Sequence, residues 1–92
     1  ANAMGPNKTE VQQFLKANLP ENSYIEIEFE NNLFALYKLF DIYVHTPVDK
    51  EIEAFGQTYI EALASCIPSI FTLSGVANEF VVNKENALVV DY

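Results

Sequence analysis

Two glutamates, Glu53 and Glu61, lie eight positions apart in a stretch that could bind a phosphorylated, hydroxyl-rich ligand. Gly56 breaks the regular structure between them, and Thr58 begins a helix-forming run. Glu53 is therefore expected in a loop, and Glu61 about one turn inside a helix. Glycine lets backbone approach a ligand closely, and a helix N-terminus favours anions. This combination predicts a site for a sugar nucleotide.

The composition describes one small acidic domain. The chain has 92 residues, half of them hydrophobic, which is enough for a core. Thirteen acids against five lysines, with no arginine, give a net charge of −8. Such a surface repels nucleic acid, so no nucleic-acid partner is expected. It also repels a nucleotide diphosphate unless cations come from elsewhere.

Several local features indicate a cytoplasmic protein. No apolar run approaches the roughly 18 residues that span a membrane, so no transmembrane segment is expected. No basic-then-apolar segment resembles a secretory signal. Residues 1–3, before Met4, resemble an expression-tag remnant and are set aside. The single cysteine, Cys66, fits a reducing compartment and is interpreted as a small buried filler.

The hydrophobic pattern alternates between the periods of helices and strands. Helices are predicted over residues 9–19, 33–40 and 57–66, with a further short one carrying Phe80, Val81 and Val82. Strands are predicted over residues 24–29, 42–46, 69–73 and 87–90. Alternation of this kind favours parallel pairing with helices on both faces. We expect an α/β fold, a Rossmann-like three-layer α/β/α arrangement with a parallel sheet of about four strands.

The expected core includes one aromatic pair and one face of the third helix. Tyr37 and Phe40 continue the apolar stripe of the helix over 33–40 and are interpreted as core residues. The helix over 57–66 is expected to bury Ile60, Leu63 and Ala64.

Five pieces of the chain resemble, in order and spacing, the donor-binding C-terminal domain of GT-B retaining glycosyltransferases of group 1 (GT4). The pieces are FDIYVHTP (40–47), EAFGQTYIEALAS (53–65), IPSI (67–70), SGVANEFV (74–81) and NALVV (86–90). Residues 9–39 resemble the preceding part of that domain more loosely. The resemblance implies that residues 4–92 are a partial donor-binding domain.

The resemblance also implies roles for individual residues. Glu53 and Glu61 match the two acids of the family's E-x7-E motif. Glu53 would take the catalytic position beside the transferred sugar, and Glu61 would accept hydrogen bonds from the ribose hydroxyls. Phe55, Gly56 and Gln57 would shape the loop that faces the sugar, and Thr58 would lie where the helix points at the diphosphate.

The implied reaction is transfer of a glycosyl group from a nucleotide sugar to an acceptor hydroxyl, with retention. It needs no metal and no other cofactor, because protein cations and helix dipoles stabilise the departing diphosphate. The family's arginine and lysine clamp and its N-terminal acceptor domain have no counterpart here. We therefore expect an inactive fragment, whose full-length parent is cytoplasmic or peripheral to a membrane. The alternative is a non-catalytic α/β module that forms a homodimer through an exposed sheet edge.

Four further positions leave open questions. His45, at the end of a predicted strand, could contact a ligand or simply pack. Glu79 could match an acid of the family or stabilise a helix end. Cys66 and Ala87 stand where the family usually has glycine, which is tolerable only if the backbone there avoids positive φ.

Overall fold

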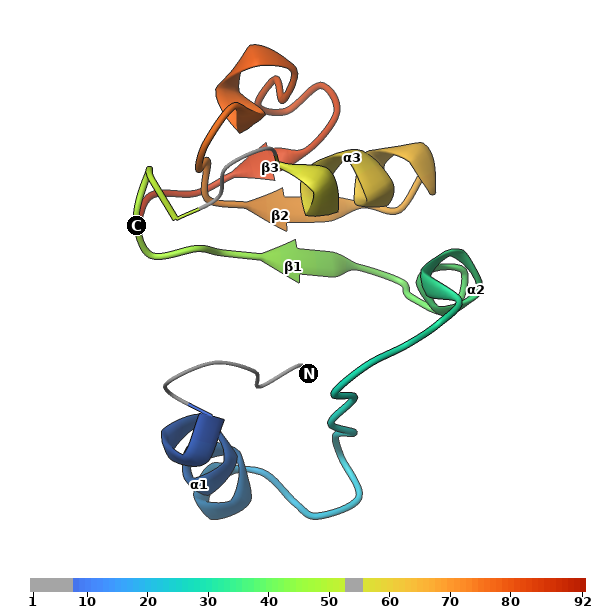
Figure 1. Ribbon diagram of the computed structural model, residues 1–92, viewed down its shortest axis with the longest axis vertical. Helices are drawn as coiled ribbons and strands as arrows, with labels where there is room; N and C mark the ends of the chain where they lie inside the picture. The colour runs from blue at the N-terminus through green and yellow to red at the C-terminus, as the bar shows by residue number, and fades with distance from the viewer. Residues whose placement is uncertain (1–7, 53–55) are drawn as a thin grey trace. The chain divides into compact units, whose positions relative to one another are not determined.

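The computed structural model describes residues 8–52 and 56–92, which form two compact units, one ending at Asn31 and one spanning Asn32–Tyr92. Below they are called unit 1 and unit 2. Figure 1 shows the elements in chain order: α1 (Lys8–Asn18), α2 (Leu33–Tyr37), β1 (Tyr43–His45), α3 (Gln57–Ala64), β2 (Ser69–Phe71), the 3-10 helix η1 (Ala77–Glu79) and β3 (Leu88–Val89).

Unit 1 contains α1, which confirms the helix predicted over 9–19. The prediction of a strand over residues 24–29 is wrong. That segment is not in the sheet, and it exposes Ile25 and Phe29. Its acidic side chains contact α1 instead: Glu28 accepts from Lys8, and Glu26 Oε2 lies 3.4 Å from Gln12 Nε2. Alternation predicts how side chains would face along a strand, but a strand also needs a neighbour to pair with.

Unit 2 is built on a parallel sheet in the order β1-β2-β3. Parallel neighbours need crossover connections, and α3 supplies the one between β1 and β2 (Figure 1). The α/β class and the Rossmann-like parallel arrangement are therefore confirmed. The described sheet has three strands rather than the expected four, since residues 24–29 do not join it.

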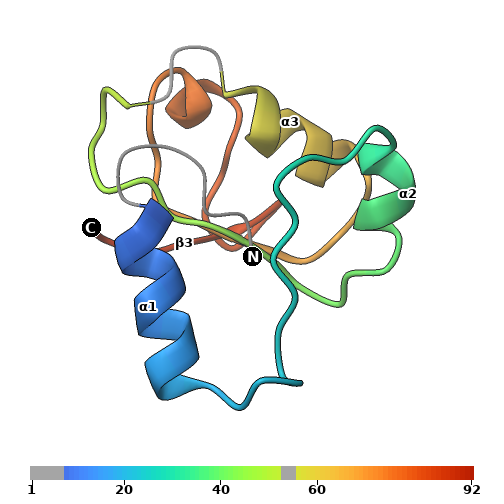
Figure 2. The same cartoon turned by 60° about the horizontal axis from the view of Figure 1, so that its bottom comes forward.

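The core of unit 2 lies between α3, η1 and one face of the sheet. Figure 2 shows α3 and the orange turn of η1 on the same side of the strands. The buried cluster consists of Tyr59, Ala62, Phe71, Ala77, Val81 and Ala87. Along β1, Tyr43 and His45 are half-buried, whereas Val44 between them is exposed. One face of the sheet therefore carries the core.

The helix α3 presents a different face to the core from the one predicted. Tyr59 and Ala62 are completely buried, Leu63 is half-buried, and Ile60 and Ala64 are exposed. Ile60 and Tyr59 are neighbours in the sequence, so only one of them can face the sheet. Tyr59 takes that place because its hydroxyl finds hydrogen-bond partners at the end of β2.

A second predicted helix is shorter than expected, and the prediction of a helix that carries Phe80, Val81 and Val82 is wrong. Asn32 caps α2, its Oδ1 accepting from the Ala35 N–H at 3.1 Å. The helix ends at Tyr37, which is buried as predicted, and half-buried Phe40 lies beyond it. The helix expected to carry Phe80, Val81 and Val82 is a single 3-10 turn that ends at Glu79.

Cys66 contradicts two expectations. Its φ is 57°, in the left-handed region, and its side chain is exposed rather than a buried filler. It directly follows the C-cap Ser65, and its N–H bonds to the Leu63 carbonyl at 3.1 Å. This is where helices commonly end on a left-handed glycine. Ala87, in contrast, is not in that region.

Replacing Cys66 with glycine should therefore raise the free energy of unfolding by about 1 kcal/mol, because a left-handed conformation costs an L-residue about that much. Urea unfolding followed by circular dichroism measures the change. Ala64→Gly, two residues earlier in the helix, is the matched control and should lower stability by about 1 kcal/mol. A Cys66→Gly chain as unstable as Ala64→Gly would contradict the prediction.

Candidate functional site

The predicted site residues Gly56, Gln57 and Thr58 form the N-terminus of α3, whereas Glu53 and Phe55 lie outside the described residues. Gly56 is the N-cap, with φ 64° and ψ 29°. A Cβ atom there would lie 3.3 Å from Tyr59 Cδ2 and 3.4 Å from Phe80 Cζ. Both the backbone conformation and the crowding therefore favour glycine at this position.

Tyr59 fastens this end of α3 to the sheet. Its hydroxyl donates to the Thr72 carbonyl at 2.6 Å and accepts from the Ser74 N–H at 3.1 Å, and the side chain is completely buried. The first turn of the helix is thereby held against the segment that leaves β2. Sequence reasoning did not single out Tyr59. Tyr59 lies three positions before Ala62, so the two residues share one face of the predicted helix. That face was the alternative to the face of Ile60, which was predicted to be buried.

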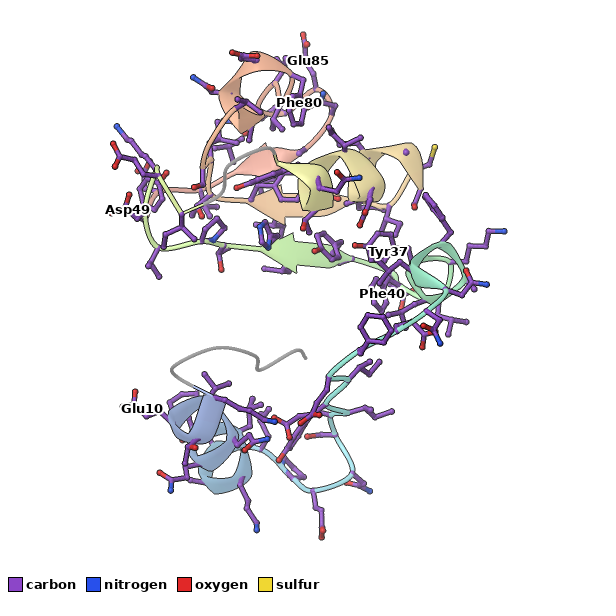
Figure 3. All side chains as sticks on the ribbon, viewed as in Figure 1. Glu10, Tyr37, Phe40, Asp49, Phe80 and Glu85 are labelled. Atoms are coloured by element: carbon purple, nitrogen blue, oxygen red, sulfur yellow. The ribbon has the colours of Figure 1, made fainter. Side chains whose placement is uncertain are left out.

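Backbone hydrogen bonds also connect the segments at the carboxyl ends of β1 and β2. The His45 carbonyl accepts from the Thr72 N–H at 3.3 Å, and the Lys50 carbonyl accepts from the Gly75 N–H at 2.7 Å. The ring of His45 lies 5.0 Å from that of Tyr59, edge to face. Figure 3 labels Asp49 in the loop that follows β1 at this end of the sheet. Ligands of open parallel sheets bind outside the carboxyl ends of strands.

The N-terminal turn of α3 has the features of an anion site. The first N–H groups of a helix have no partner within it and carry partial positive charge. Gln57 is exposed and Thr58 half-buried, so this turn is accessible to solvent. These groups could bind a phosphate at the carboxyl ends of β1 and β2.

Glu61 lies one turn further along α3 and is half-buried. Its Oε2 accepts a hydrogen bond from the Tyr37 hydroxyl at 3.2 Å. Tyr37 stands at the end of α2, close to Phe40 (Figure 3). Its ring lies 5.7 Å from that of Phe40 and 5.3 Å from that of Tyr43. The carboxylate predicted to bind a ligand is thus held by a neighbouring helix.

The phenol of Tyr37 stays protonated at neutral pH. Burial raises its pKa above the ordinary value, a hydrogen bond with Tyr43 opposes this, and the negative charge of Glu61 raises it further. Tyr37 is therefore a hydrogen-bond donor to Glu61 over the physiological range.

The family model described as "Glycosyl transferases group 1" matches residues 4–92. The chain belongs to this family. Comparison with curated proteins gives no match, and neither does comparison with solved structures. As a group 1 glycosyltransferase the chain is assigned to glycosyl transfer, and the resemblance proposed from its sequence pieces is confirmed at that level.

Other features of this group 1 glycosyltransferase chain concern metals and membranes. Among the described residues, no group of three or more His, Cys, Asp or Glu side chains could hold a metal ion. Glu53 lies outside the described residues, so metal independence stays a prediction. None of the helices described is long and apolar enough to cross a bilayer. Glu79 ends η1 and is exposed. It takes no part in the hydrogen bonds of the Tyr59 hydroxyl.

Proposed function

We propose that residues 4–92 carry part of the donor site of a GT-B fold, retaining (GT4) glycosyltransferase, which transfers a sugar from a nucleotide sugar to an acceptor hydroxyl. One observation carries the proposal. The N-terminus of α3, with left-handed Gly56 at its start, is tied through Tyr59 to the carboxyl end of β2. Glu61 follows about one turn later on the same helix.

Each part of a nucleotide sugar has a proposed partner. The diphosphate lies at the N–H groups of Gln57 and Thr58, where the helix dipole favours negative charge. The ribose hydroxyls donate to Glu61, since a carboxylate accepts strong, charge-assisted hydrogen bonds. Glu53 and Phe55 take their roles from the resemblance: Glu53 is the catalytic carboxylate beside the sugar, and Phe55 shapes the adjoining loop.

The charge of the chain bears on how complete the site is. The chain has five lysines and no arginine against thirteen acids. It therefore has few cations that could stabilise a departing diphosphate. We propose that the missing cations and the acceptor site belong to other parts of a larger protein, and that residues 4–92 are inactive alone. The proposed reaction uses no metal. The proposed setting of the larger protein is the cytoplasm, and the alternative is a peripheral position at a membrane.

Titration of the chain with a uridine or a guanosine diphosphate sugar, followed by NMR, tests the donor site. The amide signals of Gly56, Gln57 and Thr58 should shift with a dissociation constant in the millimolar range. The affinity should be low because charge-assisted contacts to the diphosphate are few. Shifts confined to unit 1, or no shift with either compound at a concentration about tenfold above the millimolar range, would contradict a donor site in this chain.

A second candidate function is self-association, and the exposed face of the sheet favours it. Val44, Ile70 and Leu88 are paired in register and therefore share one face. Val44 is 58 % exposed and Leu88 44 %. We propose that a second copy covers this face, together with the edge of β1. Sedimentation velocity should then show a dimer that Val44→Lys weakens and the loop control Val48→Lys does not. A strictly monomeric wild-type chain at high concentration would rule it out.

A further inference from the structure

Tyr37 holds the carboxylate of Glu61 in one place. The two side chains come from different helices, α2 and α3, and meet at 3.2 Å between the Tyr37 hydroxyl and Glu61 Oε2. Tyr37 is only 5 % exposed, and its ring packs against those of Phe40 and Tyr43. A ring enclosed in this way cannot swing, so its hydroxyl has a fixed position. The glutamate side chain, by contrast, has three rotatable bonds and would otherwise sample many positions.

The contact leaves Glu61 able to bind a ligand. An ionised carboxylate offers about four acceptor sites on its two oxygens, and the Tyr37 hydroxyl fills one of them. Glu61 is half-buried, so part of this residue is exposed to solvent. A donor on one side of the carboxylate therefore orients the remaining acceptor sites toward an incoming ligand.

We propose that Tyr37 is the positioning residue that orients Glu61 for the vicinal hydroxyls of a ribose. This rests on the proposed function, because it assigns Glu61 the same partner. Preorganisation of this kind increases affinity, since the cost of ordering the side chain is met on folding rather than on binding. Tyr37 itself contacts the carboxylate and not the nucleotide.

The Tyr37→Phe variant tests the proposal, because it removes the hydroxyl and keeps the ring and its packing. The probes are uridine or guanosine diphosphate, whichever the wild-type chain binds, and the 2′,3′-dideoxy form of the same nucleotide. Tyr37→Phe should weaken binding of the ribonucleotide by about 3–10-fold, the effect of one hydrogen bond. Binding of the dideoxy nucleotide should not change, because that nucleotide has no hydroxyl for Glu61 to hold.

Glu61→Gln completes a double-mutant cycle. In the Glu61→Gln background, Tyr37→Phe should have much less effect than in the wild-type background, since the charged partner is gone. Tyr24→Phe removes a hydroxyl from unit 1 and is the matched control. Thermal unfolding of each variant gives the temperature below which that variant is folded. Binding is then compared at a temperature where every variant is folded, so a difference in binding reflects affinity and not a loss of folded protein.

The possible outcomes separate the two proposals. If the wild-type chain binds neither diphosphate, or Glu61→Gln binds as tightly as the wild type, the proposed function fails and the role of Tyr37 fails with it. If Glu61→Gln weakens binding and Tyr37→Phe does not, only the positioning role is overturned. Equal weakening of the ribo and dideoxy nucleotides by Tyr37→Phe also overturns it, because that pattern indicates a general structural role.

Discussion

Tyr59→Ala should lower the free energy of unfolding of unit 2 by about 3–5 kcal/mol, the usual cost of truncating a large buried aromatic side chain. Tyr59 is completely buried and contacts the rings of His45, Phe71 and Phe80. The substitution also removes the hydroxyl that accepts a hydrogen bond from the Ser74 N–H. Because small domains have only about 5–15 kcal/mol of stability in total, this loss removes between about a fifth of that stability and all of it, and the variant should unfold at a much lower urea concentration than the wild type.

Tyr59→Phe separates the tether from the packing. It keeps the ring and removes the hydroxyl that joins α3 to the end of β2. The expected loss is about 1–3 kcal/mol, since two buried backbone groups lose a partner. Tyr92→Phe is the matched control: Tyr92 also donates to a carbonyl, that of Leu73, but is 55 % exposed, so its loss should stay within about 0.5 kcal/mol.

Urea unfolding followed by circular dichroism measures both variants. Equal stabilities for Tyr59→Phe and Tyr92→Phe would contradict the role of Tyr59 as a tether. If Tyr59→Phe is less stable but folded, NMR should show its largest amide shifts at Ser74 and at the start of α3, where the lost hydrogen bonds lie.

The second large effect concerns ligand binding. Glu61→Ala should weaken binding of a uridine or guanosine diphosphate sugar by roughly 10–100-fold. This corresponds to about 1.5–3 kcal/mol for a hydrogen bond to a charged group, at 1.4 kcal/mol for each factor of ten. NMR titration of the chain measures the change.

Glu85→Ala is the control for net charge, because it removes an equivalent acid from an exposed turn between η1 and β3. Its affinity should equal that of the wild type or exceed it slightly, since one negative charge fewer repels the diphosphate less. If Glu61→Ala and Glu85→Ala bind alike, Glu61 does not contact the ligand. In a longer enzyme that contains this domain, unchanged activity after Glu61→Ala would contradict the same assignment.

The elements with strong local signals could be predicted from the sequence. Periodic apolar residues placed α1 and α2. The alternation of short apolar runs with helical stretches predicted parallel pairing, and β1, β2 and β3 confirm it. Gly56 was predicted to precede the helix, and it is the N-cap of α3. The pieces around Glu53 and Glu61 led to the family.

The tertiary structure decided what depends on partners distant in the sequence. Residues 24–29 have the alternation of a strand, yet their acids contact Lys8 and Gln12 of α1 instead of joining the sheet. Cys66 takes a left-handed backbone because α3 ends there, although nothing in its own side chain favours it. Periodicity reports which side chains share a face. It does not report which neighbour that face will meet.

The candidate site shows the same division. The types and spacing of Gly56, Thr58 and Glu61 are properties of the sequence, and they indicated the chemistry. The positions of these residues depend on Tyr59, which bonds to the backbone of Thr72 and Ser74, thirteen and fifteen residues away. The carboxylate of Glu61 likewise depends on Tyr37, twenty-four residues away. Local preferences along the chain specify helices and turns, whereas hydrogen bonds and packing between distant residues orient the side chains that meet a ligand.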